Sequence, residues 1–232
     1  MSATRKRDDL PRPVTRRQRE RLRALLRRYN DCPAARAAIV AELERTFSQA
    51  LAILVLDTCG FSRTVHANGI VPFLATLQRL SEIVRPCIVD GGGRVLRVEA
   101  DNIFALFATP GEAVACAVTI LDALACANEG RADGDGIHVS IGLGYGDLLV
   151  VANDDLYGDE MNLACKLGED LAEEDEVLLT PGAWRALGPS PWPFEAVDYS
   201  ISGLELNAHR LLRQAHGEPA RCCSATEQTW TR

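Results

Sequence analysis

A run of six apolar residues, Leu51 to Leu56, ends at Asp57 and is followed by a Cys-Gly-Phe-Ser turn. A uniformly apolar run of this length predicts a central strand that is buried on both faces. A second acid, Asp101, lies in the turn of a predicted hairpin over 94–98 and 102–108. Either acid alone would be interpreted as a helix cap or a turn residue. Two carboxylates at the edges of neighbouring strands, beside free backbone N–H groups, favour a site for a divalent metal and a triphosphate.

The composition is that of a globular protein, with 232 residues, 47% hydrophobic and 25% charged. This length suits one domain of ordinary size with appendages, and the composition excludes a disordered chain. No apolar stretch approaches the roughly 20 residues that span a bilayer, and the N-terminal segment lacks a signal-peptide core. We therefore expect a cytoplasmic protein.

The eight cysteines contain no CxxC pair and no Cys/His spacing suited to zinc. Most of them lie in apolar segments, which predicts buried free thiols in a reducing compartment. The adjacent Cys222 and Cys223 lie in a polar tail and are assigned no role.

The net charge of −7 hides an asymmetry, because residues 1–30 carry eleven Lys or Arg and three acids, which leaves −15 on the remainder. A basic segment can bind nucleic acid or an anionic membrane, or it can be a helix whose arginines are solvated or rest on the acidic body. No aromatic residue that could stack on bases precedes Tyr29. The solvated helix is favoured, so neither a membrane nor a nucleic-acid partner is expected.

The predicted organisation is a disordered basic arm (1–12), a helical extension (13–49), a core domain (50–215) and a polar tail (216–232). Thr15 is expected to cap a helix over 16–29, and a second helix is expected over 33–49. In the core, apolar spacing predicts helices over 63–86, 110–128, 159–172 and 181–187, and strands over 51–57, 94–98, 102–108, 137–144, 147–152, 176–180, 194–199 and 207–213. This order predicts an α+β fold, with helices packed on a sheet elaborated from a ferredoxin-like core.

Three ordered motifs resemble the class III nucleotidyl cyclases, the catalytic domain of adenylate and guanylate cyclases. Residues 53–62, ILVLDTCGFS, are similar to the strand, metal aspartate and Gly-Phe-Thr turn of that family. Residues 93–101, GRVLRVEAD, are similar to its second metal hairpin, and residues 156–167 to its Gly-Asp-x-Val-Asn-x-Ala-x-Arg helix. The resemblance covers about 50–190 and implies the class III cyclase sheet.

The resemblance implies a role for each matching residue. Asp57 and Asp101, with the carbonyl of Thr58, would hold two Mn²⁺ or Mg²⁺ ions per active site. Backbone N–H groups would cradle phosphates, at Cys59, Gly60, Phe61 and Ser62.

Asn162 would position the ribose, and Lys166 stands where the family has an arginine that stabilises the transferring phosphate. Lysine keeps the charge but lacks the bidentate fork. In the family the metal acids of one subunit meet the asparagine helix of another. The resemblance therefore implies a homodimer that binds a nucleoside triphosphate at two sites.

At the two base-reading positions of the family this chain has Arg97 and Asp155, although a short connection leaves Asp154 as an alternative to Asp155. Adenylate cyclases have lysine at the first of these positions, and guanylate cyclases usually have an acid. Arginine would shrink the pocket, and donor–acceptor matching admits either uracil or cytosine. The chain most resembles the bacterial pyrimidine cyclases of antiphage signalling (Pycsar), which implies cyclic UMP or cyclic CMP as product, sensed by a downstream effector. Overall resemblance favours UTP over CTP.

Three alternatives stay open. An adenylate cyclase requires Arg97 to read adenine, and a catalytically inactive cyclase-like module that binds nucleotide fits the Lys166 replacement but not the retained Asp57, Asp101 and Asn162. A nucleic-acid-binding protein is disfavoured by the acidic remainder. Diguanylate cyclases are set aside because their acidic pair does not follow Gly91–Gly93.

Overall fold

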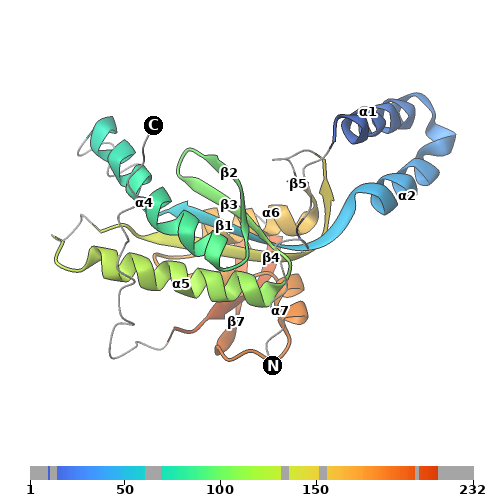
Figure 1. Cartoon of the computed structure of the whole chain (residues 1–232). Coiled ribbons are helices and arrows are strands. Elements are labelled where there is room, and N and C mark those ends of the chain that lie inside the picture. The colour runs from blue at the N-terminus through green and yellow to red at the C-terminus, as the bar shows by residue number, and fades with distance from the viewer. Residues whose placement is uncertain are drawn as a thin grey trace.

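The computed structural model describes residues 10, 15–60, 69–131, 136–151, 156–201 and 204–213. In this part of the chain a mixed sheet has the strand order β2-β3-β1-β4-β6-β8-β7, and the short β5 pairs with β4 (Figure 1). Neighbouring strands are antiparallel except for β4 and β6. The strands are β1 (Ser48–Thr58), β2 (Arg94–Glu99), β3 (Asn102–Phe107), β4 (Val139–Val150), β5 (Leu156–Tyr157), β6 (Val177–Leu179), β7 (Phe194–Ile201) and β8 (Leu204–Leu211).

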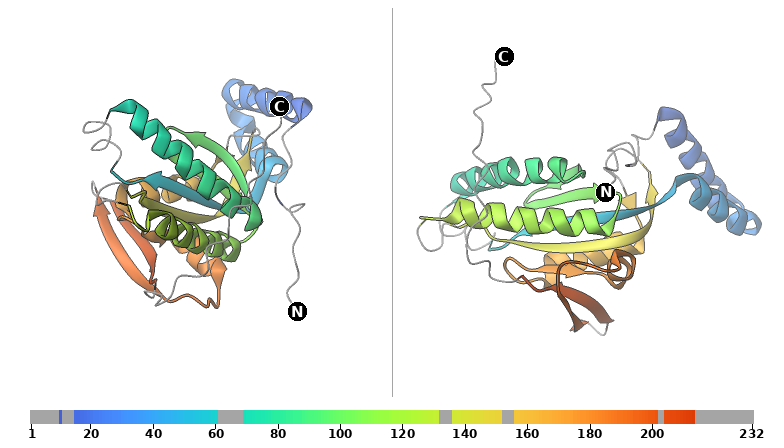
Figure 2. Two further views of the ribbon diagram at one scale, coloured as in Figure 1. Left: turned by 60° about the vertical axis from the view of Figure 1, so that its left-hand side comes forward. Right: turned by 60° about the horizontal axis from the view of Figure 1, so that its bottom comes forward.

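Helices cover both faces of the sheet, as expected for the buried central strand β1. On one face Leu54 and Leu56 pack in a cluster with helices α4 (Ile70–Asp90) and α5 (Pro110–Asn128). On the other face Ile53 and Val55 pack in a cluster with α6 (Asp159–Cys165). Figure 2 shows α4 and α5 side by side on one face of the sheet. The alternation of side chains along a strand explains the two clusters, and the predicted α+β class is confirmed.

Two helices precede the sheet and project from it (Figure 1). Helix α1 (Arg16–Asp31) begins at Thr15, which forms a capping box with Gln18, so the predicted cap is confirmed. A 3₁₀ turn, η2 (Pro33–Ala35), leads into α2 (Arg36–Phe47). Both helices bury their apolar stripes mainly against each other. The predicted domain limits stay a prediction, and the predicted tail, 216–232, lies outside the described residues.

The glycine-rich segment Gly144–Gly146 lies inside a strand and not between two strands. The sequence predicts strands over 137–144 and 147–152, but β4 runs without a break and pairs with β1 from Ser48↔Leu149 to Thr58↔Val139. Glycine is required here for packing, because a Cβ on Gly144 would lie 2.6 Å from the backbone oxygen of Glu160 in α6. The prediction of two strands was therefore wrong.

Two helix boundaries also differ from the prediction. Helix α4 begins at Ile70, after Gly69 with φ +84°, and continues to Asp90 through Pro86, whereas 63–86 was predicted. The predicted helix over 159–172 divides into α6 and a π-helical segment, η3 (Lys166–Leu171). The α-helical turn of α6 changes to the wider π-helical turn of η3 where Gly168 packs against the backbone of Gly142.

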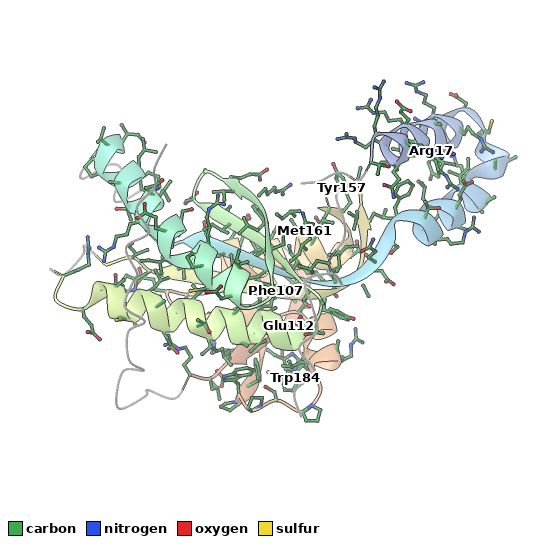
Figure 3. The ribbon with its side chains drawn as sticks, in the orientation of Figure 1. Arg17, Phe107, Glu112, Tyr157, Met161 and Trp184 are labelled. Carbon is green, nitrogen blue, oxygen red and sulfur yellow. The ribbon has the colours of Figure 1, made fainter. Side chains whose placement is uncertain are left out.

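Two expectations about the core need correction. Cys126 is disulfide-bonded, while the other described cysteines carry free thiols, so the argument from free thiols to a reducing compartment fails at this residue. Helix α5 is long and apolar enough to span a membrane by length and composition. In the fold α5 is a core helix, because its residues pack in the cluster that covers β1. Glu112 lies in the first turn of this helix, and Phe107, at the end of β3, packs in the same cluster (Figure 3).

Candidate functional site

Strand β1 places Asp57 and Thr58 at its C-terminal end. By the strand alternation, Asp57 follows Ile53 and Val55 on the face that carries α6 and η3. The Cα partner of Asp57 in β4 is Ser140, whose hydroxyl donates to the Gly168 carbonyl at 2.8 Å. Asp57 is therefore half-buried next to the π-helical segment.

The turn between β2 and β3 brings the second acid to the same place. Asp101 lies in that turn, after Ala100, which has φ +50°. The Thr58 hydroxyl donates to the Asp101 carbonyl at 3.1 Å, which joins the end of β1 to the turn. The structure thus brings together the three predicted metal-site residues, Asp57, Thr58 and Asp101.

Electrostatic repulsion marks this site. Burial, followed by the negative charge of Asp101, raises the pKa of Asp57 to about 6, and Glu169 and Asp170 of η3 act in the same direction. Asn102 donates to Glu169 at 3.2 Å, which holds η3 against the turn. Burial and the charges of Asp170 and Asp101 also raise the pKa of Glu169. A bound cation would remove this repulsion between carboxylates.

The donor set fits a hard divalent cation. No group of three or more His, Cys, Asp or Glu side chains suited to a metal occurs among the described residues. Two carboxylates and the Thr58 carbonyl provide oxygen ligands only, and they leave coordination positions for substrate phosphates and water. Mg²⁺ and Mn²⁺ are held in this way by a few carboxylates plus phosphate.

The raised pKa leads to a stability prediction. An acid whose folded pKa lies above its unfolded value of 3.8 opposes folding as the pH rises through the window from about 4 to about 6. At pH 7 without metal, Asp57→Asn is therefore expected to raise the Tm by about 2–4 °C, as for a gain of about 1 kcal/mol. Differential scanning calorimetry checks this, and Mn²⁺ should raise the Tm of wild type only. A lower Tm for metal-free Asp57→Asn would contradict the repulsion.

The expected phosphate cradle is only partly described. Cys59 and Gly60 form a turn directly after β1, but the Cys59 N–H donates to the His138 carbonyl at 3.0 Å. This N–H already has a backbone acceptor one residue beyond the β1–β4 pairing, so it is not free to bind a phosphate as expected. Phe61 and Ser62 lie outside the described residues. The described helix α4 begins ten residues after Gly60.

Arg97 is held in place by its own hairpin. A register shift between Val95 and Arg97 places Arg97 opposite Phe104, and the guanidinium lies over the Phe104 ring at 4.5 Å. Its Nε is 3.3 Å from a Glu99 oxygen without hydrogen-bond geometry, and it has no hydrogen-bond partner among the described residues. The positive charge of Arg97 also acts on Cys165 at the end of α6. The neighbouring Leu96 packs in one cluster with Ala164 of α6, which brings this strand close to the helix that carries Asn162.

Helix α6 and the following η3 carry the remaining predicted catalytic groups. Asn162 is exposed, and Lys166 follows one turn later at the start of η3. The Lys166 ammonium donates to Asp170 at 3.0 Å, a partner that the sequence analysis did not identify. Spacing i, i+4 in a helical segment was the available signal. In the described part of the chain no hydrogen bond or ion pair joins Asn162 or Lys166 to Asp57 or Asp101.

Three glycines set the position of α6 and η3 on the sheet. A Cβ on Gly142 would lie 2.0 Å from the Ala164 carbonyl oxygen, and a Cβ on Gly168 would lie 2.9 Å from that of Val55. With the Gly144 contact, these approaches bring the helix backbone directly onto β1 and β4. Larger residues would push α6 away from the sheet.

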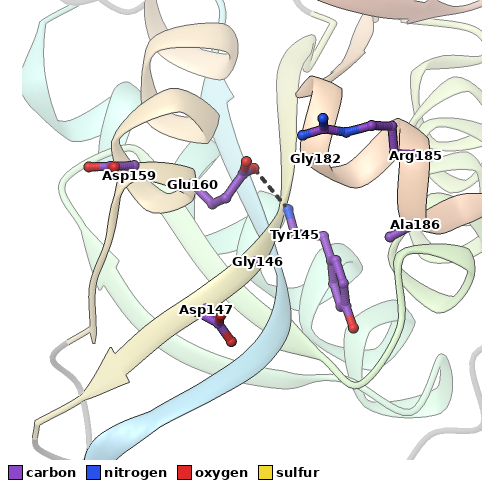
Figure 4. Close-up of a pocket in the computed structure, with 8 residues that line it drawn as sticks. All are labelled: Tyr145, Gly146, Asp147, Asp159, Glu160, Gly182, Arg185 and Ala186. Carbon is purple, nitrogen blue, oxygen red and sulfur yellow. Dashed lines mark hydrogen bonds between the residues drawn. The ribbon is translucent and has the colours of Figure 1, made fainter. Parts of the chain in front are cut away.

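A cavity of about 610 Å³ lies next to α6, at the edge of β4 beyond its pairing with β6 (Figure 4). Glu160 extends into it and accepts from the Tyr145 N–H at 3.1 Å and the Thr180 hydroxyl at 2.5 Å. Thr180 also caps helix α7 (Pro181–Leu187), so Glu160 links β4, α6 and α7. None of the predicted site residues lines this cavity. Glu160 holds α6 in place, a role that the sequence analysis missed.

Among the described residues, no hydrogen bond or ion pair joins the two parts of the predicted site. The metal group is at the end of β1, while Asn162 and Lys166 are on α6 and η3. The predicted base-reading residue Asp155, with its alternative Asp154, lies outside the described residues.

No protein-family model matches the chain. The curated "Putative adenylate cyclase 3" of Rhizobium meliloti (strain 1021) is 30% identical over 131 residues, which is 56% of this chain. The chain spans only 22% of the length of that relative.

Solved structures match a larger share of this chain. The adenylate/guanylate cyclase/hydrolase from Silicibacter pomeroyi is 23% identical with a TM-score of 0.62, over 72% of this chain and 98% of that one. The adenylyl cyclase CyaB from P. aeruginosa is 14% identical with a TM-score of 0.62, over 72% and 96%. The guanylate cyclase domain of RhGC from Catenaria anguillulae, in complex with GTP, is 15% identical with a TM-score of 0.60, over 72% and 96%. The chain therefore has the fold of the class III adenylate and guanylate cyclases.

Proposed function

We propose that this chain is a class III nucleotidyl cyclase, which converts a nucleoside triphosphate into a 3′,5′-cyclic monophosphate and pyrophosphate. The observation that carries the proposal is the pair Asp57 and Asp101, joined at the end of β1 through the Thr58–Asp101 hydrogen bond. In this reaction the ribose 3′-oxygen bonds to the α-phosphorus, pyrophosphate leaves, and the hydroxyl proton is lost. Because the attack is intramolecular, the protein contributes mainly orientation and charge stabilisation.

Two Mn²⁺ or Mg²⁺ ions per site would be held by Asp57, Asp101 and the Thr58 carbonyl. When bound, they supply activation of the 3′-hydroxyl and neutralisation of the triphosphate charge. The Asn102–Glu169 bond would fix the turn that carries Asp101.

A homodimer completes the site in this proposal. Among the described residues Asn162 and Lys166 form no hydrogen bond or ion pair with the two aspartates of their own chain, which supports their meeting the aspartates of a second copy. Asn162 would orient the ribose. Lys166 would exchange its bond to Asp170 for the transferring phosphate, so it contributes a point charge and not a bidentate contact.

We propose a pyrimidine as the base, with UTP favoured over CTP. Arg97 is held between the Phe104 ring and Glu99. In this position it would leave a smaller pocket for the base than an unrestrained lysine at the same position. Asp155 would accept from the uracil N3–H or the cytosine amine. By resemblance to the antiphage pyrimidine cyclases, the product would be a second messenger in antiviral defence that a downstream effector senses. The runner-up is an adenylate cyclase, the activity in the printed name of the curated relative.

A substrate panel tests the proposal. Purified protein is incubated with Mn²⁺ and, separately, ATP, GTP, CTP or UTP, and products are identified by mass spectrometry. Cyclic UMP is expected to be the main product, with cyclic CMP second. If cyclic AMP were the only product, the pyrimidine assignment would be wrong and the protein would be an adenylate cyclase. No cyclic product from any nucleotide would favour the inactive module.

Arg97→Lys tests whether Arg97 reads the base. Lysine removes the fork and frees space, so the ratio of UTP to ATP turnover is expected to fall by about tenfold, the equivalent of about 1.4 kcal/mol. The measured quantity is kcat/KM for each nucleotide. Arg94→Lys on the same strand is the matched control and should leave the ratio unchanged. An unchanged ratio in Arg97→Lys would assign base selection elsewhere.

A further inference from the structure

The projecting helices α1 and α2, together called the arm, leave an apolar groove at their base. It has a volume of about 310 Å³ and lies between the arm and the end of β4, with Leu26, Phe47, Leu149, Val151 and Tyr157 in its lining. Leu26 is 46% exposed and Tyr157 is 57% exposed. We call this hollow the arm groove. Figure 3 shows Tyr157 at the side of the molecule that carries the arm.

A second apolar surface lies at the opposite end of the molecule, at the start of α4 (Figure 1). Ile70, Val71 and Leu74 are 55%, 72% and 54% exposed, while only Phe73 of this first turn is buried. We call these three residues the α4 tip. Single exposed apolar residues are ordinary, but three on one helix end form a patch that suits a contact.

The tip cannot fill the groove of its own chain. Strand β1 begins directly after the arm and ends before the segment that leads to α4. Its eleven residues span about 33 Å at about 3.3 Å per residue, and they separate the two surfaces. The tip that enters a groove must therefore come from another molecule.

The arm and the rest of the chain carry opposite net charges. Residues 15–47 carry nine Arg and four acids, whereas residues 48–232 carry twelve Lys or Arg and twenty-six acids. In the described part of the chain Arg17, Arg19 and Arg23 form no ion pair with an acidic side chain. Figure 3 shows Arg17 on the projecting arm, away from the sheet. The acidic body of a second copy would neutralise this basic surface.

We infer that the arm groove binds the α4 tip of a second copy of this chain, in a head-to-tail pair with two-fold symmetry. Such a pair makes the contact twice, and each basic arm lies over the acidic body of its partner. The inference specifies the surfaces of the dimer in the proposed function, and it rests on that dimer only. The experiment below measures the dimer Kd and not enzymatic turnover. It can therefore fail while the cyclase assay succeeds, and the cyclase assay can fail while it succeeds.

Sedimentation velocity of the full chain, at about 1 to 100 µM, measures the dimer Kd. Leu26→Glu in the groove and Val71→Glu in the tip are each expected to raise the Kd at least about tenfold, because a charge enters an apolar contact twice per dimer. Val89→Glu, at the other end of α4 and 39% exposed, is the matched control and should leave the Kd unchanged. Thermal melts of all variants should coincide, because these side chains are substantially exposed.

The double variant Leu26→Lys with Val71→Glu tests direct contact. Opposite charges would then face each other, so the Kd is expected to return to within about threefold of wild type. A monomeric wild type, an unchanged Kd in either single variant, or no recovery in the double variant would overturn the inference. Binding to phosphatidylglycerol vesicles that Leu26→Glu abolishes, with an unchanged Kd, would assign the groove to a membrane surface instead.

Discussion

Asp57→Ala is expected to abolish cyclic nucleotide formation, with kcat/KM reduced by at least about a thousandfold, because one of the two carboxylates that hold the metal ions is lost. Asp101→Ala is expected to have the same effect. Neither variant should unfold the domain, since removing one acid relieves the repulsion that raises the pKa of Asp57. Turnover with Mn²⁺ and the preferred nucleotide, measured alongside the circular dichroism melt, checks both expectations.

Asp90→Ala is the matched control, because this exposed acid ends α4, at the opposite end of β2 from the turn that carries Asp101. It should retain full activity. Substantial turnover in Asp57→Ala would mean that the two aspartates do not hold the metal. Loss of both the fold and the activity would leave Asp57 with a structural role and would contradict the repulsion.

Gly142→Ala is expected to destabilise the protein by about 2–3 kcal/mol, which lowers the Tm by roughly 5–10 °C. The new methyl group would meet the Ala164 carbonyl oxygen at 2.0 Å, and this neighbour is backbone that cannot rotate away. Helix α6 must then move off β4, so activity should fall together with stability, because Asn162 moves with the helix. Thermal denaturation and the cyclase assay are the two measurements.

Gly111→Ala provides the comparison. In helix α5 a Cβ at this position would lie 3.9 Å from its nearest neighbour, and alanine favours a helix over glycine. Its Tm is expected to be unchanged or slightly higher. Equal losses at Gly142 and Gly111 would mean that the close approach of α6 to β4 has no special energetic weight.

Local pattern was sufficient for most elements of the fold. The six apolar residues before Asp57 predicted the central strand, and Thr109 and Pro110 mark the start of α5, which runs from Pro110 to Asn128 as predicted. These signals depend on neighbours in the sequence, such as side-chain period, capping and the proline at the first turn. The pair Asp57 and Asp101 was also visible, because each acid ends or joins a predicted strand.

Contacts between distant segments were not predictable in this way. Gly144–Gly146 resembles a turn locally, yet β4 continues through it because β1 pairs along its whole length and α6 needs glycine beneath it. The roles of Glu160 and Asp170 also depended on the packing of α6 and η3. The local turn preference of these glycines is overridden because β1 supplies hydrogen bonds along β4 and α6 packs closely on it.

By itself, the sequence determined the α+β order of elements and the two carboxylates at strand ends, because hydrophobic period and turn chemistry are local properties. Only the tertiary structure decided how these parts meet. Thr58 joins the Asp101 turn, Arg97 is fixed against Phe104 through a register shift, and the arm projects with its groove open. Such features depend on long-range pairing and on backbone approaches, which a linear pattern does not encode.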